Sequence, residues 1–86
     1  MTSEPRPEFW VLYRQLPDEA KASARKAYML FMQNPGHPSL HFKPLEGYDG
    51  VWSVRVSQKY RSVGVRYGDV IQWFWIGTHN EFDKRF

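Results

Sequence analysis

Residues 51–83 read VWSVRVSQKYRSVGVRYGDVIQWFWIGTHNEFD and carry the clearest strand pattern in this chain. Apolar and polar residues alternate over 51–57 and again over 60–67, which is the period of a half-buried β-strand. Gly68-Asp69 is a tight-turn signal, and the apolar run 70–77 that follows is typical of a strand covered on both faces. The stretch therefore predicts a meander of three short antiparallel strands.

Two helices are predicted before these strands. Residues 7–15 carry apolar side chains at i, i+3, i+4 and i+7 spacing, which indicates a short helix. A strand stays open there, because Trp10 and Val11 blur the pattern. A second helix begins near Pro17, where proline suits the first turn and two acids follow, and it runs to about Gln33 with an alanine-rich apolar stripe.

Residues 39–45 could add a short strand, which Pro44 would limit to a sheet edge because proline lacks an N–H group. The resulting expectation is an α+β fold in which two N-terminal helices pack on one face of a three- to four-stranded antiparallel sheet. The opposite face would be left for function. We expect one domain over residues 1–86, with residues 1–6 loose.

The composition restricts the classes of function. The chain has no Cys, so it has no disulfide, no thiolate nucleophile and no zinc–thiolate site. No apolar run approaches the roughly 20 residues of a membrane span, and residues 1–10 lack a signal-peptide pattern. We therefore expect a cytoplasmic protein without a membrane partner. The net charge of +3 favours anionic partners, and all four cations between Arg55 and Arg66 stand without an acid among them.

Cations alternate with aromatic rings along the predicted strands. Arginine and lysine bind phosphates, and flat rings stack on unpaired bases, so such a sheet is typical of a single-stranded nucleic acid binder. His79 follows the last strand, and imidazole exchanges protons near neutral pH, so the same surface could also cleave the strand. The alternative for His79 is an ordinary surface histidine at a strand end.

Side-chain alternation places the first arginine. Arg55 points away from Trp52 and Val54, so it lies on the free face, where its planar guanidinium could clamp a phosphate. A solvated strand arginine is the alternative. Lys43 and Lys59 are candidate substrate contacts in predicted loops, where a lysine can equally be solvated.

The second arginine is less simple. Arg61 has the parity of Val63, which would put it on the apolar side of the sheet. Either its side chain reaches past the sheet edge, or a bulge at Tyr60 re-aims it. A structural ion pair of Arg61 with Glu81 or Asp83 is the alternative.

Two other pairs are not expected to belong to the site. Trp73 and Trp75 share one face of the last strand by parity and suit a core better than a base-stacking platform. His37 and His41 flank a proline-rich turn and lack the spacing or carboxylate partner of a metal site. We therefore expect no bound metal.

Five pieces of the chain have a familiar order and spacing: FWVLYRQLP, AxxxARKAYMLF, NPGHPSLHFKPL, WSVRVSQKYRSVGV and WFWIGTHNEFD. Together, from about Phe9 to Asp83, they resemble the RelE/ParE superfamily of toxins from bacterial type II toxin–antitoxin modules. The Gly-x-His motif at 77–79 is similar to the HigB- and YafQ-like branch.

The resemblance implies a small toxin that a cognate antitoxin holds inactive in a hetero-oligomer. Many relatives are ribosome-dependent endoribonucleases, or mRNA interferases, which cut mRNA on the ribosome with the 2′-hydroxyl as nucleophile and without a cofactor or metal. ParE relatives share the fold but poison DNA gyrase. A non-catalytic relative that only binds its antitoxin is the third alternative.

The resemblance also implies the site. We expect His79, Arg61, Arg55 and Asp83 to be catalytic, because the reaction needs proton transfer and stabilisation of phosphate charge. The family uses an arginine at the position of Arg61 near the scissile phosphate. Asp83 lies one helical turn after His79, where it could hold the imidazole or accept a proton. Several relatives have a catalytic tyrosine in this zone, which Asp83 and a candidate substrate contact, Phe82, occupy here.

Overall fold

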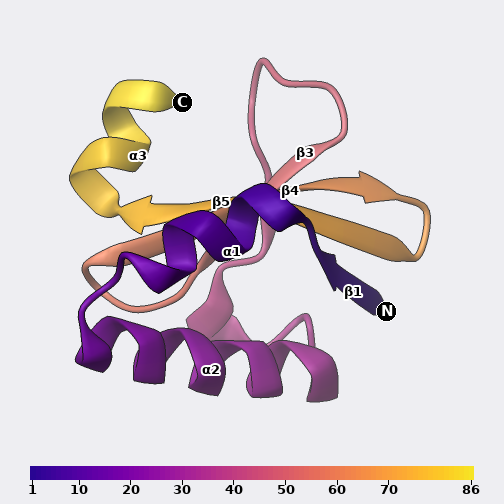
Figure 1. The fold of residues 1–86 in the computed structure, drawn as a ribbon. Coiled ribbons are helices and arrows are strands. Elements are labelled where there is room, and N and C mark those ends of the chain that lie inside the picture. The colour runs from indigo at the N-terminus through magenta and orange to yellow at the C-terminus, as the bar shows by residue number, and fades with distance from the viewer.

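A mixed sheet of five strands forms the middle of the molecule, with helices on both faces (Figure 1). The computed structural model describes all residues 1–86. The spatial strand order is β1-β5-β4-β3-β2. The elements along the chain are β1 (Thr2–Pro5), α1 (Pro7–Arg14), α2 (Asp18–Gln33), the 3-10 helix η1 (Pro38–Leu40), β2 (Lys43–Pro44), β3 (Val51–Arg55), β4 (Tyr60–Tyr67), β5 (Val70–Thr78) and α3 (His79–Arg85).

The predicted α+β fold is confirmed, since both helices and the three-stranded antiparallel meander are present. Two short strands extend the meander to five. β2 has two residues and contains Pro44 at the sheet edge, as expected for a residue that cannot donate a ladder hydrogen bond. None of the helices combines the length and the hydrophobicity that a membrane span requires.

The N-terminal segment differs from the expectation that residues 1–6 are loose. Residues 2–5 form β1 and pair in parallel with residues 70–73 of β5. Trp73 Nε1 donates a hydrogen bond of 2.7 Å to Ser3 Oγ and fastens the strand to the sheet. Local composition does not reveal this pairing, because β1 is only four residues long and its partner lies near the other end of the chain.

The main core lies between the sheet and α2. Phe31 of α2 packs edge-on against Trp73 with ring centroids 5.4 Å apart. Leu40, Val54 and Ile71 complete the buried cluster. Burial of these side chains, rather than helix propensity, holds α2 against the sheet.

The prediction that Trp73 and Trp75 share a face is wrong, because β5 contains a β-bulge. Val63 of β4 pairs with Trp75, whereas the next residue, Gly64, pairs with Trp73, so Phe74 is an extra residue in β5. One extra residue inverts the side-chain alternation beyond it. Trp73 therefore faces α2, and Trp75 faces the opposite side of the sheet.

The opposite face is not entirely free, because α3 covers part of it (Figure 1). Trp75 contacts Phe82 and Phe86, with ring centroids 6.3 Å and 5.4 Å away. Val63 is fully buried on this face. These apolar contacts fix α3 beside the basic end of the sheet, which positions the candidate site.

Candidate active site

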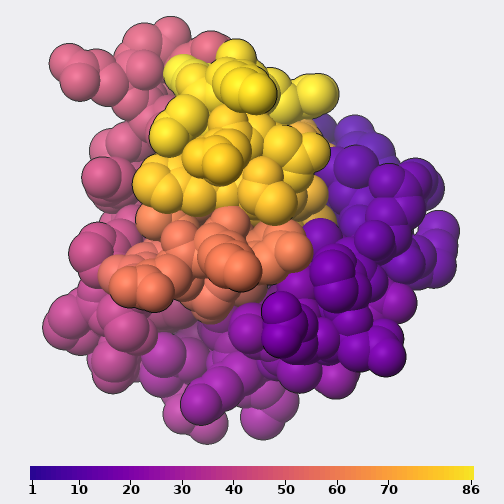
Figure 2. Space-filling view, turned by 90° about the vertical axis from the view of Figure 1, so that its left-hand side faces the viewer, coloured from indigo at the N-terminus to yellow at the C-terminus, as the bar shows by residue number.

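A mostly polar cavity of about 510 Å³ lies beside α3, on the sheet face opposite α2. Figure 2 shows the segments that meet there: α3 in yellow lies against the orange β3–β4 segment, and the pink-to-magenta chain of residues 41–50 flanks them. The residues that line the cavity are His41, Lys43, Pro44, Leu45, Glu46, Ser53, Arg55, Arg61, His79, Phe82 and Asp83. The four residues predicted to be catalytic are all in this set.

Arg55 and Arg61 are direct cross-strand partners in the β3–β4 ladder and share one face. The side-chain parity of Arg61 with Val63 is correct, but Val63 lies on the α3 face rather than in the α2 core. Arg61 therefore needs no bulge at Tyr60 to reach the site. The bulge lies further along the sheet, at Phe74.

The guanidinium of Arg61 is held by the β3–β4 loop. Its Nη1 atom donates hydrogen bonds to the carbonyl oxygens of Ser57 at 2.7 Å and Tyr60 at 3.0 Å. Partial burial, and then the charge of Arg55, lower the pKa of Arg61, while Asp83 opposes the shift. No carboxylate lies within 4.0 Å of Arg61, so the ion-pair alternative is wrong. Nη2 and Nε remain free to bind an anion.

His79 is the first residue of α3, and Asp83 stands one turn later. The His79 Nε2 and Asp83 Oδ2 atoms are 3.4 Å apart, with 47% and 62% of the two side chains exposed. So exposed a pair adds little stability, but it orients the imidazole. A capping box between Thr78 and Glu81 begins α3, and the His79 N–H group donates to the Lys59 carbonyl at 2.6 Å. The hydrogen bonds from Thr78 lower the pKa of Glu81.

His41 lines the same cavity as His79, although no local pattern in the sequence points to it as a site residue. It follows η1 with φ 46° and ψ 44°, the left-handed conformation that a residue with a side chain rarely adopts. Backbone strain of this kind gathers at functional sites. His37, on the same turn, lies outside the cavity and accepts a hydrogen bond from the Ser39 N–H group instead.

Two of the three predicted substrate contacts lie at the cavity. Lys43 and Phe82 line the cavity, whereas Lys59 does not. Ser53 and Glu46 line it without having been predicted. Side-chain parity could have found Ser53, which shares the face of Arg55 in β3. No local signal points to Glu46, because its loop reaches the site only through the folded chain.

Solved structures show the same architecture at low sequence identity. A chain of the RelB–RelE antitoxin–toxin complex from Methanococcus jannaschii aligns with a TM-score of 0.75 at 15% identity, over 96% of this chain and 98% of that chain. YafQ from Escherichia coli gives 0.73 at 13% identity, over 93% and 94%. Isolated E. coli RelE gives 0.66 at 16% identity, over 98% and 96%. The fold is therefore that of the RelE-type toxins.

The sequence itself matches a known protein family. The model of the ParE-like toxin domain matches residues 20–84, which is most of the chain. No curated protein sequence matches. The chain belongs to the ParE-like toxin family, and it shares its fold with the RelE and YafQ toxins. The resemblance that the sequence pieces indicated is confirmed.

Proposed function

We propose that this toxin is a metal-independent, ribosome-dependent mRNA endoribonuclease of the YafQ- and HigB-like branch, which inhibits translation in the cytoplasm. The observation that carries the proposal is one cavity lined by two arginines and two histidines: Arg55, Arg61, His41 and His79. Arginines can neutralise a phosphodiester, and imidazoles can move protons, which are the requirements of RNA cleavage.

In the proposed reaction the 2′-hydroxyl of the bound strand attacks the adjacent phosphorus. The O2′–P bond forms and the P–O5′ bond breaks, giving a 2′,3′-cyclic phosphate and a 5′-hydroxyl end. His79 takes the 2′-hydroxyl proton while Asp83 holds its Nε2 atom, and His41 gives a proton to the leaving 5′-oxygen. Arg55 and Arg61 balance the charge that develops on the phosphate oxygens.

We also propose a cognate antitoxin as the stable partner, in a toxin–antitoxin hetero-oligomer. The structural neighbours support this, since they include the RelB–RelE complexes of M. jannaschii and Pyrococcus horikoshii and the DinJ–YafQ complex of E. coli. An acidic segment of the antitoxin would suit the cations at the cavity, and it would block the path of mRNA to Arg55 and Arg61.

The experiment that tests the activity supplies purified toxin to ribosomes that translate a defined mRNA, with primer extension to map the cuts. We expect wild-type cleavage, a loss of about 100-fold or more in rate for His79→Ala, and an unchanged rate for His37→Ala, which lies outside the cavity. Thermal unfolding of each variant shows whether it keeps its fold.

Other outcomes separate the alternatives. Full cleavage by His79→Ala would contradict the assignment of the site. An intact mRNA together with inhibited DNA gyrase supercoiling would favour the gyrase-poisoning activity of ParE relatives. If neither activity is found but the antitoxin binds tightly, the chain is a non-catalytic antitoxin-binding relative.

A further inference from the structure

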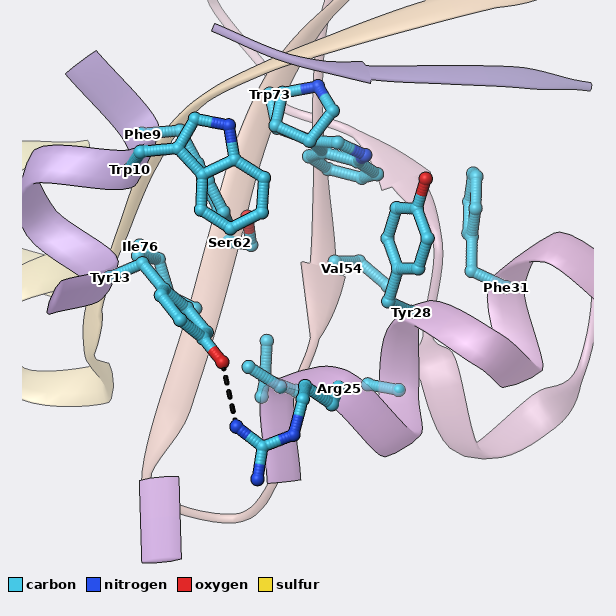
Figure 3. A pocket seen from close by; sticks show the side chains of 14 residues that line it. Phe9, Trp10, Tyr13, Arg25, Tyr28, Phe31, Val54, Ser62, Trp73 and Ile76 are labelled. Carbon is cyan, nitrogen blue, oxygen red and sulfur yellow. Dashed lines mark hydrogen bonds between the residues drawn. The ribbon is translucent and has the colours of Figure 1, made fainter. Parts of the chain in front are cut away.

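A second cavity, of about 390 Å³, lies on the other side of the sheet, between α1, α2 and the strands (Figure 3). Trp10 and Tyr13 of α1 form one wall, Tyr28 and Phe31 of α2 form the facing wall, and Trp73 closes one end. Most of the lining is apolar, in contrast to the candidate active site. The sheet separates the two cavities, so a ligand of this one does not occupy the place of mRNA.

The hydrogen-bond donors on the floor of the cavity already have partners within the protein. Ser62 Oγ already donates a hydrogen bond of 2.9 Å to the carbonyl oxygen of Trp75, and Trp73 Nε1 is bonded to Ser3 Oγ. A hydrogen-bond acceptor of a ligand would find no free donor on this floor and would lose its water contacts without replacement, so the floor favours an apolar group.

The mouth carries one cation. Arg25 Nη1 of α2 donates a hydrogen bond of 2.9 Å to the Tyr13 hydroxyl of α1, which bridges the two helices (Figure 3). No carboxylate lies within 4.0 Å of Arg25. A guanidinium has five N–H donors, so this bond leaves the group able to bind an anion as well.

The volume of the cavity indicates the kind of ligand that fits it. The cavity of about 390 Å³ opens to solvent beside the Arg25–Tyr13 bridge. The same volume falls within the range of small-molecule sites, which are mostly apolar with a few polar groups that set orientation.

We propose that this cavity binds a small amphipathic organic anion, with an aromatic body on the apolar floor and a carboxylate on Arg25. The aromatic body lies among Trp10, Tyr28 and Trp73. The ligand contacts α1, α2 and the sheet together, so its binding draws these three elements into one unit. This site is separate from the proposed cleavage of mRNA and does not depend on it.

The test uses 1-naphthylacetate as the probe and its neutral analogue 2-(1-naphthyl)ethanol as the comparison. We expect saturable binding of the acid with a dissociation constant below about 1 mM, followed by tryptophan fluorescence and NMR. The alcohol should bind about tenfold more weakly, because it lacks the charge-assisted hydrogen bond to Arg25. Nuclear Overhauser contacts should join the naphthyl ring to Trp73 and Phe31.

Three variants make the test specific. Arg25→Gln should abolish the preference for the acid, whereas Lys26→Gln, which removes the neighbouring cation outside the cavity, should keep it. Ala27→Phe should fill the cavity and exclude both probes while mRNA cleavage persists. Because the readout is binding, a toxin that proves inactive on mRNA still tests this proposal.

Several results would overturn the proposal. The first is the absence of saturable binding of either probe to the folded wild-type chain. The second is equal affinity for acid and alcohol, or a preference for the acid that survives Arg25→Gln. The third is a structure of the toxin–antitoxin complex with an antitoxin side chain in the cavity, which would assign the space to the protein partner instead.

Discussion

Arg55 and Arg61 face each other directly across the β3–β4 ladder, and neither has a carboxylate within 4.0 Å. Like charges that are directly opposite on neighbouring strands destabilise a sheet. Burial is the main cause of the lowered pKa of Arg61, and the charge of Arg55 lowers it further. The repulsion should therefore lower the stability of the sheet, and an anion bound between the two side chains would offset it.

Replacement of Arg55 by Gln should make the toxin more stable and less active. Removal of the repulsion should raise the free energy of unfolding by about 0.5 kcal/mol, and the rate of mRNA cleavage should fall by about 100-fold. Urea denaturation and the ribosome assay measure the two effects. Arg66→Gln is the matched control, and it should lower the free energy of unfolding instead. Arg66 Cζ lies 4.5 Å from the Trp52 ring centroid, so the substitution removes a favourable cation–π contact. A less stable Arg55→Gln protein would contradict the prediction.

An anion should stabilise the wild-type toxin more than the Arg55→Gln variant. A ligand that binds only the folded state at 100 times its dissociation constant adds about 2.7 kcal/mol to the unfolding free energy. A short RNA with 2′-O-methyl groups cannot be cleaved and supplies the phosphodiester. This RNA should raise the thermal unfolding temperature of the wild-type toxin strongly and that of the Arg55→Gln variant much less. Equal shifts for both proteins would show that Arg55 does not contact the phosphate.

Two substitutions of His41 separate the effect of its backbone conformation from the effect of its imidazole. In the left-handed region His41→Gly should be about 1 kcal/mol more stable than His41→Ala, because glycine adopts φ 46° without a clash of Cβ. Both variants should lose cleavage by about 100-fold if the imidazole is a catalytic acid, and the pH–rate profile should lose one limb. The matched control is His37→Ala. Retained cleavage by His41→Gly would remove His41 from the mechanism.

The capping box of α3 predicts a pH dependence of stability. The pKa of Glu81 is lowered in the folded state, mainly by the hydrogen bonds from the Thr78 N–H group and hydroxyl, both 2.9 Å long. A group with a lowered folded pKa stabilises the protein above its unfolded value, and this contribution is lost as the pH falls through the folded value. Glu81→Gln should therefore be less stable than wild type at pH 7, and the difference should shrink below pH about 4.

Substitution of Thr78, the other residue of the capping box, tests the same helix cap. Thr78→Ala should lower the unfolding free energy by about 1 kcal/mol, since the Glu81 N–H group loses its acceptor. Thr78→Ser keeps the hydroxyl and should be close to wild type. Denaturation by urea at pH 7 distinguishes the two. An equal loss in both variants would mean that the methyl group, rather than the cap, matters.

The bulge in β5 depends on a close approach at Gly64. A Cβ atom there would lie 2.8 Å from the Gln72 carbonyl oxygen and 2.9 Å from Trp73 Cε3, so Gly64→Ala should destabilise the toxin by about 2 kcal/mol. Gly36→Ala is the matched control, since its nearest neighbour is Asn34 Oδ1 at 3.6 Å. If the two variants have equal unfolding free energies, the sheet relaxes around the methyl group and the prediction is wrong.

Local pattern was sufficient for most elements of the fold. Helical periodicity predicted α1 and α2, and the alternation in β3 placed Arg55 opposite the α2 core. The spacing of His79 and Asp83 predicted their contact across one helical turn. These features depend on residues close together in the chain, whose geometry follows from the helical and strand repeats.

Long-range features needed the folded chain. Local patterns in the chain predict two helices, a meander and a basic strand surface, because propensity and period are local properties. The folded chain alone reveals that β1 joins the sheet, that Trp73 and Trp75 face opposite sides, and that His41 meets His79 in one cavity. The physical reason is that strand pairing and side-chain packing join distant segments, and a single extra residue in a strand reverses every face that follows it.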